Sequence, residues 1–310
     1  MDVPDELKSL DLCMEAVRHF GMALMFVPRA FRTEELCLEA VRENGLAMEY
    51  VPEDLLTVSR FCREAVRAFG FTLEWVPEEL KTEDLCMEAV TQDGFTLQYV
   101  PEGLKTPEIC VAAVANSGYA LFYVPDGLKT PSLCLEAVRQ DGMALKFVPE
   151  SLKTPEICLE AVKQDGMALE FVPEALKTPE ICRTAACSGA GAVGQALEWT
   201  PKAVLTESMC LMAVERSDLE YGPCLEFVPE NLKTEKLCSA AVAADPTNLA
   251  FVPDTLITET MCWDAVARDP SALEFVPDEM LTVDLMDMVP QEIRTKVMGE
   301  AGTVCTLLPQ

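Results

Sequence analysis

The sequence predicts an all-α solenoid built from about eleven copies of a 24-residue repeat. The first observation is an aromatic–(Val or Thr)–Pro step that returns at a nearly constant interval, for example at Pro101, Pro125 and Pro149. The second is a single cysteine at a fixed offset in each copy, and the third is a set of helix start and stop signals around it. A unit this short cannot bury its apolar face alone, so the copies must stack. The marker prolines are Pro28, Pro52, Pro77, Pro101, Pro125, Pro149, Pro173, Pro201, Pro229, Pro253 and Pro277.

The first half of each repeat is predicted to be an α-helix, as the copy LKTPEICLEAVKQDGMALEFVPE at 152–174 illustrates. Thr154 is a natural N-cap, Pro155 suits the first helical position, and Glu156 favours the positive end of the helix dipole. Gly166 is expected to end the helix as a C-terminal stop. One apolar stripe runs along the helix: Ile157, Cys158, Ala161 and Val162.

The second half of the repeat, MALEFVPEAL, allows two interpretations. A short helix that ends near Phe171 or Val172 is favoured, because the residue before a proline avoids the α region. The alternation through Leu169, Glu170 and Phe171 also suits a short strand, which would give an α/β solenoid of the leucine-rich-repeat kind. In either case Leu169 and Phe171 are expected in the core.

The repeats are expected to form one solenoid domain over residues 1–280, followed by a C-terminal cap at 281–310. Two adjacent copies carry insertions near 183–194 and 211–222. These insertions lengthen two successive intervals between marker prolines, Pro173–Pro201 and Pro201–Pro229. Insertions in repeat proteins map to loops on one face. We therefore expect the two inserts to project from the same edge.

The segment LCLEAVRQDGMALKFVPE and its neighbours resemble bacterial tandem repeats of the domain of unknown function 4116. The shared framework consists of the Ala-Val pair, the glycine, the Ala-Leu pair and the aromatic residue at similar spacing. The resemblance covers residues 1 to about 280 and departs at the Val-Pro step, which is unusually regular here. It implies a repeat architecture and brings no established activity.

The cysteines are expected to form a reduced ladder inside the core, one thiol per repeat. Neighbouring helices pack about 8–10 Å apart, which is too far for a disulfide between equivalent positions. A thiol-based store for a soft metal is the alternative, but the sequence has no CxxC and a single histidine, His19. We expect no metal and no cofactor. The ladder comprises Cys13, Cys37, Cys62, Cys86, Cys110, Cys134, Cys158, Cys182, Cys210, Cys238 and Cys262.

The chain is strongly acidic, with a formal net charge of −28. This charge disfavours direct contact with nucleic acid or an anionic membrane and favours a basic partner. One acidic row follows the marker prolines, at Glu53, Glu78, Glu102, Asp126, Glu150, Glu174, Glu230, Asp254 and Asp278. A second acidic row lies two residues after the ladder cysteines, at Glu15, Glu39, Glu64, Glu88, Glu136, Glu160 and Asp264. A basic row opposes them, at Lys8, Lys81, Lys105, Lys129, Lys153, Lys177 and Lys233.

These features favour a non-enzymatic, monomeric scaffold that binds a basic protein or peptide. A mimic of DNA that inhibits a nucleic-acid enzyme is the alternative from the same charge, and no catalytic motif supports an enzyme. The opening MDVPDELKSL lacks a secretory signal, and no apolar run is long enough to span a membrane, so a cytoplasmic location is expected. The expected partner-binding residues are Ser188, Val193, Ser217 and Tyr221 in the inserts, flanked by Glu150, Glu174 and Glu230.

Overall fold

The computed structural model describes residues 9–188, 196–216 and 223–294, and these residues form helices and turns without a strand. The all-α prediction is confirmed, and the α/β alternative is not supported. The chain divides into two compact units, Met1–Leu152 and Lys153–Gln310. The division falls between two repeats, in the Leu-Lys-Thr link that precedes a helix.

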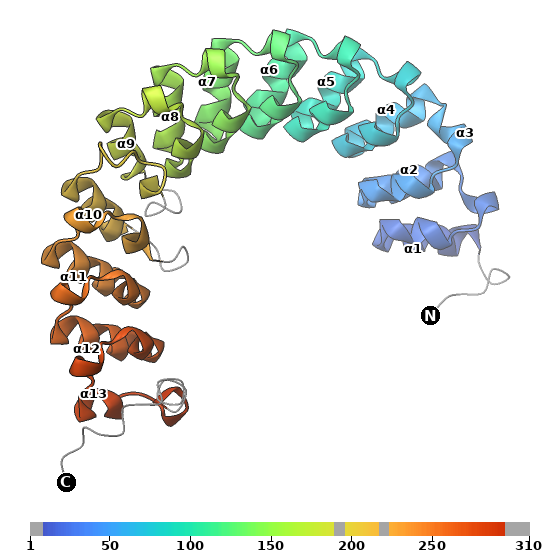
Figure 1. The fold of residues 1–310 in the computed structure, drawn as a ribbon. Helices are drawn as coiled ribbons and strands as arrows, with labels where there is room; N and C mark the ends of the chain where they lie inside the picture. The colour runs from blue at the N-terminus through green and yellow to red at the C-terminus, as the bar shows by residue number, and fades with distance from the viewer. Residues whose placement is uncertain (1–8, 189–195, 217–222, 295–310) are drawn as a thin grey trace. The chain divides into compact units, whose positions relative to one another are not determined.

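In the first unit the longer α-helices stack side by side in chain order, and one or two 3-10 helices follow most of them (Figure 1). The short α3 takes the place of the second 3-10 helix between α2 and α4. The α-helices are α1 (Leu10–His19), α2 (Glu34–Glu43), α3 (Glu53–Leu56), α4 (Ser59–Ala68), α5 (Glu83–Gln92), α6 (Pro107–Asn116) and α7 (Pro131–Gln140). The 3-10 helices are η2 (Gly21–Phe26), η3 (Arg29–Phe31), η4 (Gly45–Tyr50), η5 (Gly70–Trp75), η6 (Glu78–Leu80), η7 (Gly94–Tyr99), η8 (Glu102–Leu104), η9 (Gly118–Tyr123), η10 (Asp126–Leu128), η11 (Gly142–Phe147) and η12 (Glu150–Leu152).

The second unit repeats this arrangement, with a shorter α9 and a gap in the described chain after each of the two insert-bearing helices. Its α-helices are α8 (Pro155–Gln164), α9 (Pro179–Ala185), α10 (Glu207–Arg216), α11 (Glu235–Ala244), α12 (Glu259–Arg268) and α13 (Val283–Asp287). Its 3-10 helices include η13 (Gly166–Phe171), η14 (Glu174–Leu176), η17 (Cys224–Phe227), η18 (Glu230–Leu232), η19 (Pro246–Phe251), η20 (Asp254–Leu256), η21 (Pro270–Phe275) and η22 (Asp278–Met280).

Local signals define the ends of each helix in a repeat. The hydroxyl of Thr154 accepts a hydrogen bond from the backbone N–H of Ile157 at 3.3 Å, so the predicted N-cap of α8 is confirmed. At the other end Asp165 is extended, and its carboxylate accepts from the N–H of Met167 at 2.9 Å, which starts η13. The 3-10 helix ends at Phe171, as the downstream proline predicts.

The glycine after each helix has a different role from the one predicted. Gly166 is buried as the first residue of η13 and shows no left-handed backbone. A Cβ built on it would lie 2.5 Å from the carbonyl oxygen of Ala185 in the next helix. The position therefore requires close approach between repeats, not a left-handed C-cap. Pro246 and Pro270 fit the same position because proline suits the first residue of η19 and η21.

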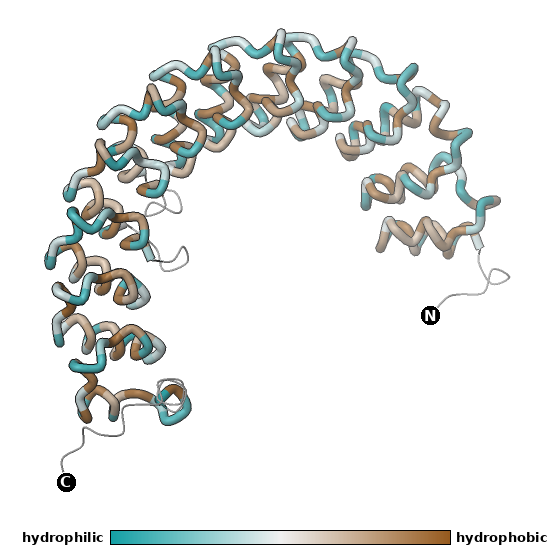
Figure 2. Tube along the Cα trace, in the orientation of Figure 1, coloured by the Kyte–Doolittle hydropathy of each residue, from teal (hydrophilic) through white to brown (hydrophobic). Residues whose placement is uncertain are grey.

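The core consists of small and branched side chains from every repeat. Cys158, Ala161 and Leu169 are fully buried, as predicted, whereas Phe171 is only half-buried. The valine after it is the core residue instead, with Val172 at 3% exposure. The 3-10 turn explains this correction, because it directs the aromatic ring along the surface and the next side chain inward. Figure 2 shows the resulting mixture of hydrophobic and hydrophilic residues within each repeat.

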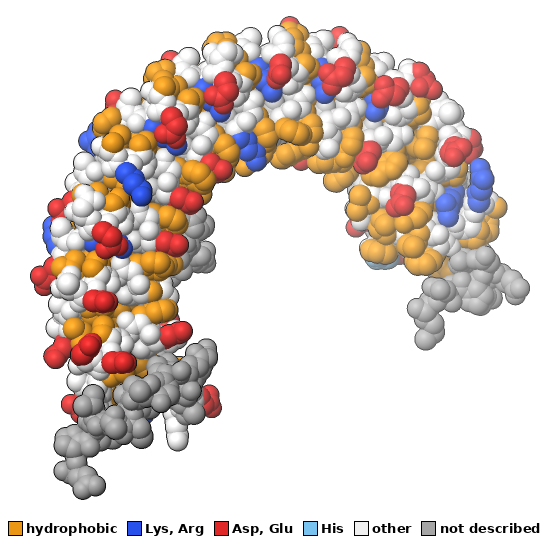
Figure 3. All heavy atoms as spheres, viewed as in Figure 1, with side chains coloured by type: hydrophobic (Ala, Val, Ile, Leu, Met, Phe, Trp, Pro, Cys, Tyr) orange, Lys and Arg blue, Asp and Glu red, His pale blue; other side chains and the backbone are white. Residues whose placement is uncertain are grey.

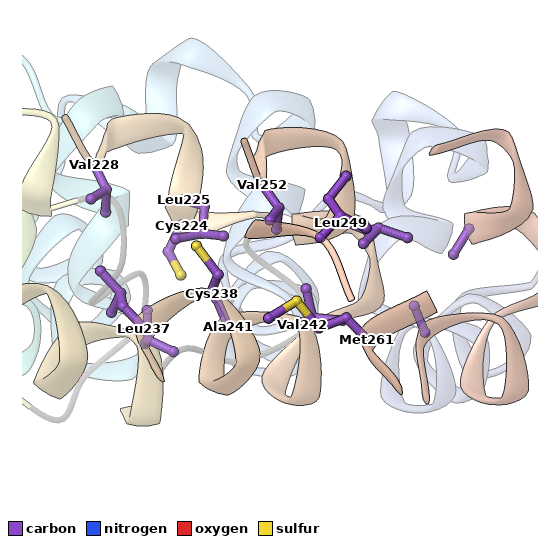
Figure 4. Packing of buried hydrophobic residues seen from close by; sticks show 14 of the residues in the cluster. Cys224, Leu225, Val228, Leu237, Cys238, Ala241, Val242, Leu249, Val252 and Met261 are labelled. Carbon is purple, nitrogen blue, oxygen red and sulfur yellow. The ribbon is translucent and has the colours of Figure 1, made fainter. Parts of the chain in front are cut away.

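Figure 4 shows the same packing in the second unit, where side chains from η17 and η19 face those of α11. Leu225 and Leu249 pack from the 3-10 helices, and Cys238 and Ala241 pack from the α-helix. Each layer thus joins two successive repeats. None of the helices in the described ranges is both long and apolar enough to cross a membrane.

The repeat pattern continues beyond the predicted boundary near residue 280. Thr282 caps α13 as the threonines of earlier repeats cap theirs, and Leu285 and Val289 are buried. Arg294 donates to the carbonyl of Val289 at 2.6 Å, much as Arg32 donates to Val27 at 2.9 Å in the first repeat. Residues 283–294 therefore form a shortened repeat, and the rest of the predicted cap, 295–310, lies outside the described residues.

Candidate functional site

The acidic row after the marker prolines is exposed but largely neutralised. Lysines of the basic row pair with it three residues along the chain, where Lys105 Nζ lies 2.5 Å from the Glu102 carboxylate and Lys233 Nζ lies 2.6 Å from Glu230. The described pairs are Glu78–Lys81, Glu102–Lys105, Asp126–Lys129, Glu174–Lys177 and Glu230–Lys233.

The lysines of these pairs have a structural role that the sequence did not reveal. Lys105 Nζ donates to the backbone carbonyl of Tyr123, 18 residues later in the next repeat, at 3.0 Å. Its side chain is only 7% exposed, although the paired Glu102 is 76% exposed. The ammonium therefore caps the last turn of η9 and joins two repeats. The same bond is made by Lys81 to Tyr99, Lys153 to Phe171 and Lys233 to Phe251.

The second acidic row alternates with arginines in the first unit. Arg42 bridges Glu39 at 3.7 Å and Glu64 at 3.9 Å, and Arg67 continues with Glu64 at 3.5 Å and Glu88 at 3.2 Å. These side chains are one-third to half exposed, so each pair adds little stability. Together with Arg18 of α1, which lies 3.4 Å from Glu39, these arginines balance the three glutamates of this row on α2, α4 and α5.

The last repeats of the second unit carry carboxylates without such counterions. The lysine position of the basic row is occupied by Ile257 and Leu281, so Asp254 and Asp278 lose their usual partners. Arg268 does not replace these lysines, because its guanidinium donates to the carbonyls of Ala243 and Ala244. On η20, α12, η21, η22 and α13, the exposed residues that pair with no described lysine or arginine are Asp254, Glu259, Asp264, Glu274, Asp278, Glu279 and Asp284.

We call these seven residues the C-terminal acidic surface. They come from η20, α12, η21, η22 and α13, which follow one another in the second unit. Figure 3 shows acidic side chains and no basic ones around α12 on the viewed face. Unpaired carboxylates on neighbouring elements leave a local negative potential that paired rows do not have. This surface can attract and orient a cation-rich partner.

The structure describes only some of the residues predicted for partner binding. Ser188 is buried, and its hydroxyl donates to the carbonyl of Ala185 at 3.0 Å. Val193, Ser217 and Tyr221 lie outside the described residues.

The acidic residues predicted to flank them are exposed but belong to different units, Glu150 in η12 and Glu174 and Glu230 in the second unit. Lys202 occupies the equivalent position between Glu174 and Glu230, so their row is interrupted. Arg183 of α9 and Met212 of α10 line a shallow hollow of about 330 Å³ between the insert-bearing repeats. Glu180, Thr206 and Ser208 also line this hollow.

The described cysteines are free, and the ladder thiols are buried. Burial raises the pKa of the Cys37 thiol to about 12 and those of Cys86 and Cys210 to about 11. Such thiols are poor nucleophiles at neutral pH. Within the described ranges no three or more histidine, cysteine or acidic side chains are grouped to hold a metal. His19 is exposed and lies 3.1 Å from the Glu15 carboxylate on the same helix.

The C-terminal acidic surface is not evident from the sequence when the acidic and basic rows are considered separately. The signal was present in the spacing. A lysine lies three residues after the acidic residue in six repeats, and leucine or isoleucine lies there after Glu53, Asp254 and Asp278. Reading the two rows as pairs would have located the unpaired carboxylates. The hydrogen bond from lysine to the next repeat could not have been found this way, because it joins residues that only the stacking brings together.

Comparison with known proteins gives one family. The family model described as a domain of unknown function (DUF4116) matches five successive segments, at residues 9–56, 33–81, 59–105, 82–129 and 131–177. Neither the curated proteins nor the solved structures contain a match to the chain. The matched segments cover more than half of the sequence and follow the repeat register, so the chain belongs to the DUF4116 family of tandem-repeat proteins.

Proposed function

We propose that the chain is a non-enzymatic, monomeric scaffold that binds a basic segment of a partner protein in the cytoplasm. The observation that carries this proposal is the C-terminal acidic surface, where the lysine position is lost and the carboxylates remain exposed. Exposed charges of one sign steer a complementary partner and set the rate of association. Such steering does not require direct contact with nucleic acid or membrane.

The chemistry of the nucleophilic groups supports the non-enzymatic part of the proposal. The ladder thiols are buried with raised pKa values, and His19 is paired on an exposed helix face. Free thiols throughout the described core suit a reducing compartment such as the cytoplasm. The proposal therefore assigns the cysteines to packing and the carboxylates to recognition.

The test compares the removal of unpaired and paired carboxylates. The first variant of the full chain carries Asp254→Asn and Asp278→Asn, and the matched control carries Glu78→Gln and Glu102→Gln, which remove the same charge from lysine-paired positions. The probe is a fluorescein-labelled peptide of alternating lysine and alanine, titrated at several salt concentrations. Two exposed charge pairs at about 0.5 kcal/mol each predict about a fivefold loss of affinity in the first variant. The control should stay within about twofold of the unmodified chain.

Equal loss in both variants would show that net charge alone binds the probe and would refute the assigned surface. The DNA-mimic alternative makes a different prediction. If the chain mimics DNA, its partner is a nucleic-acid-binding protein, and duplex DNA should compete with the chain for that partner. A partner that binds the chain equally well in the presence of duplex DNA supports the scaffold.

A further inference from the structure

The first unit contains a stretch that differs in charge from the rest of the chain. No charged residue lies between Glu108 and Asp126, although the whole protein has a net charge of −28. The second acidic row has Ala112 here, and Val111 beside it is 52% exposed. This repeat therefore keeps the fold but lacks the charged surface residues that its neighbouring repeats carry.

The same departure appears at one surface position in three successive repeats. The residue before the marker aromatic is Gln98, Phe122 or Lys146 in these repeats. All three side chains are exposed. Glutamate occupies this position in most other repeats, at Glu49, Glu74, Glu170, Glu198, Glu226 and Glu274.

Aromatic side chains from η9 and η11 meet at this position. The Phe122 ring lies 4.9 Å from that of Tyr123 and 5.0 Å from that of Phe147, between ring centroids. The Tyr119 ring meets Phe147 edge to face at 5.7 Å. On η7, which packs against η9, Phe95 occupies the position equivalent to Tyr119 and is 38% exposed. Figure 3 shows hydrophobic side chains gathered over this part of the unit.

The Lys146 ammonium lies over two of these rings. Lys146 Nζ lies 4.9 Å from the centre of the Tyr119 ring and 4.7 Å from that of Phe147. No described carboxylate pairs with it, in contrast to the lysines of the basic row. Phe122 is 58% exposed, which is high for a large apolar side chain in contact with others. We call Phe95, Tyr119, Phe122, Tyr123, Lys146 and Phe147 the aromatic patch.

From this geometry we propose that the aromatic patch is a second binding surface, which docks a peptide segment carrying apolar side chains beside a carboxylate. The rings of Phe95 and Phe122 offer the apolar contact, and Lys146 offers the ion pair. Aromatic side chains are enriched among the residues that contribute most to binding at protein interfaces. The specificity is opposite in sign to that of the C-terminal acidic surface, and the two surfaces lie in different units.

The test uses substitutions to the residue that most other repeats carry at the same position, because that residue is compatible with the fold of the repeat. Phe122→Glu and Lys146→Glu each introduce the residue that six other repeats carry at this position. The matched control is Glu226→Lys, which places a lysine at the equivalent exposed position of the second unit. The probe is a short fluorescein-labelled peptide in which leucine and phenylalanine flank one glutamate, and its twin has lysine in place of that glutamate. Anisotropy is measured on the full chain at physiological ionic strength, where long-range repulsion is screened.

The unmodified chain should bind the glutamate peptide saturably and at least about threefold more tightly than its lysine twin. Phe122→Glu should weaken binding by about tenfold, and Lys146→Glu should reverse the preference between the twins. Glu226→Lys should leave both affinities unchanged. Absence of saturable binding, or equal binding by Phe122→Glu, would overturn the proposal. Every variant leaves the C-terminal acidic surface intact, so failure here is distinguishable from failure of the proposed function.

Discussion

Replacement of Lys105 tests whether the basic row holds successive repeats together. The Lys105 ammonium lies 3.0 Å from the carbonyl oxygen of Tyr123 and 2.5 Å from the Glu102 carboxylate. Lys105→Met keeps an unbranched apolar stem but removes the donor. The Tyr123 carbonyl, at the end of η9, then loses its partner in the preceding repeat.

The structure indicates the size of the effect. A hydrogen bond to a charged group contributes about 1.5–3 kcal/mol, and part of this is offset because the buried ammonium no longer has to be desolvated. We therefore expect Lys105→Met to lower the free energy of unfolding by about 1–2 kcal/mol. Glu102→Gln removes only an exposed partner, and should cost about 0–1 kcal/mol. The two substitutions affect the same ion pair but should differ clearly in cost.

The measurement combines urea unfolding with hydrogen exchange. Repeat proteins can unfold in parts, so the global transition alone underestimates a local effect. Exchange measured by mass spectrometry on peptides covering 118–124 reports the opening of η9 directly. Faster exchange in η9 of Lys105→Met, with little change in Glu102→Gln, is expected. Equal costs for the two variants, or unchanged exchange in η9, would refute the capping role of the lysine.

Three further predictions concern the packing of the repeats. Gly118→Ala places a Cβ 2.4 Å from the carbonyl oxygen of Ala137 and should lower the free energy of unfolding in urea by about 1–3 kcal/mol. In Gly127→Ala the new Cβ meets nothing within 4 Å, so this control should be neutral or slightly stabilising. The half-buried Cys187 should react with a thiol reagent faster than the ladder cysteines in the native chain, and uniform labelling would contradict the buried ladder. The buried Cys37 thiol has a pKa of about 12, whereas thiols of the unfolded chain ionise at lower pH. The free energy of unfolding should therefore fall as pH rises from about 9 towards 12, and a free energy of unfolding that does not change with pH would contradict this.

The repeat and its helix boundaries could be predicted because they depend on short-range chemistry. The Thr154 cap and the end of the 3-10 helix at Phe171 follow from residues a few positions away. The role of Gly166 could not be predicted in the same way, since a glycine after a helix suits either a left-handed cap or a close contact. Only the stacked neighbour, with the Ala185 carbonyl at 2.5 Å, distinguishes the two.

The charge of the surface was harder to predict because it depends on contacts between successive repeats. The sequence shows rows of charge, but it does not show that Lys105 lies almost buried between Glu102 and the next repeat. The acidic row after the marker prolines is therefore mostly neutral, although the sequence shows it as a row of negative charges. The unpaired carboxylates and the aromatic patch are recognised only as departures from this regular pairing.

The loss of lysine in the last repeats connects stability with binding, and one substitution tests the connection. Ile257→Lys would place an ammonium three residues after Asp254, and by analogy with Lys233 it would also reach the carbonyl of Phe275, 18 residues later. Both bonds together should raise the free energy of unfolding by about 0.5–1.5 kcal/mol. The same change should weaken binding of the lysine–alanine peptide about twofold, because one carboxylate is neutralised. If the last repeats kept isoleucine only for packing, Ile257→Lys would destabilise the chain without affecting the peptide. Higher stability together with weaker peptide binding would instead indicate that these repeats lack the lysine cap so that a carboxylate stays available for a partner.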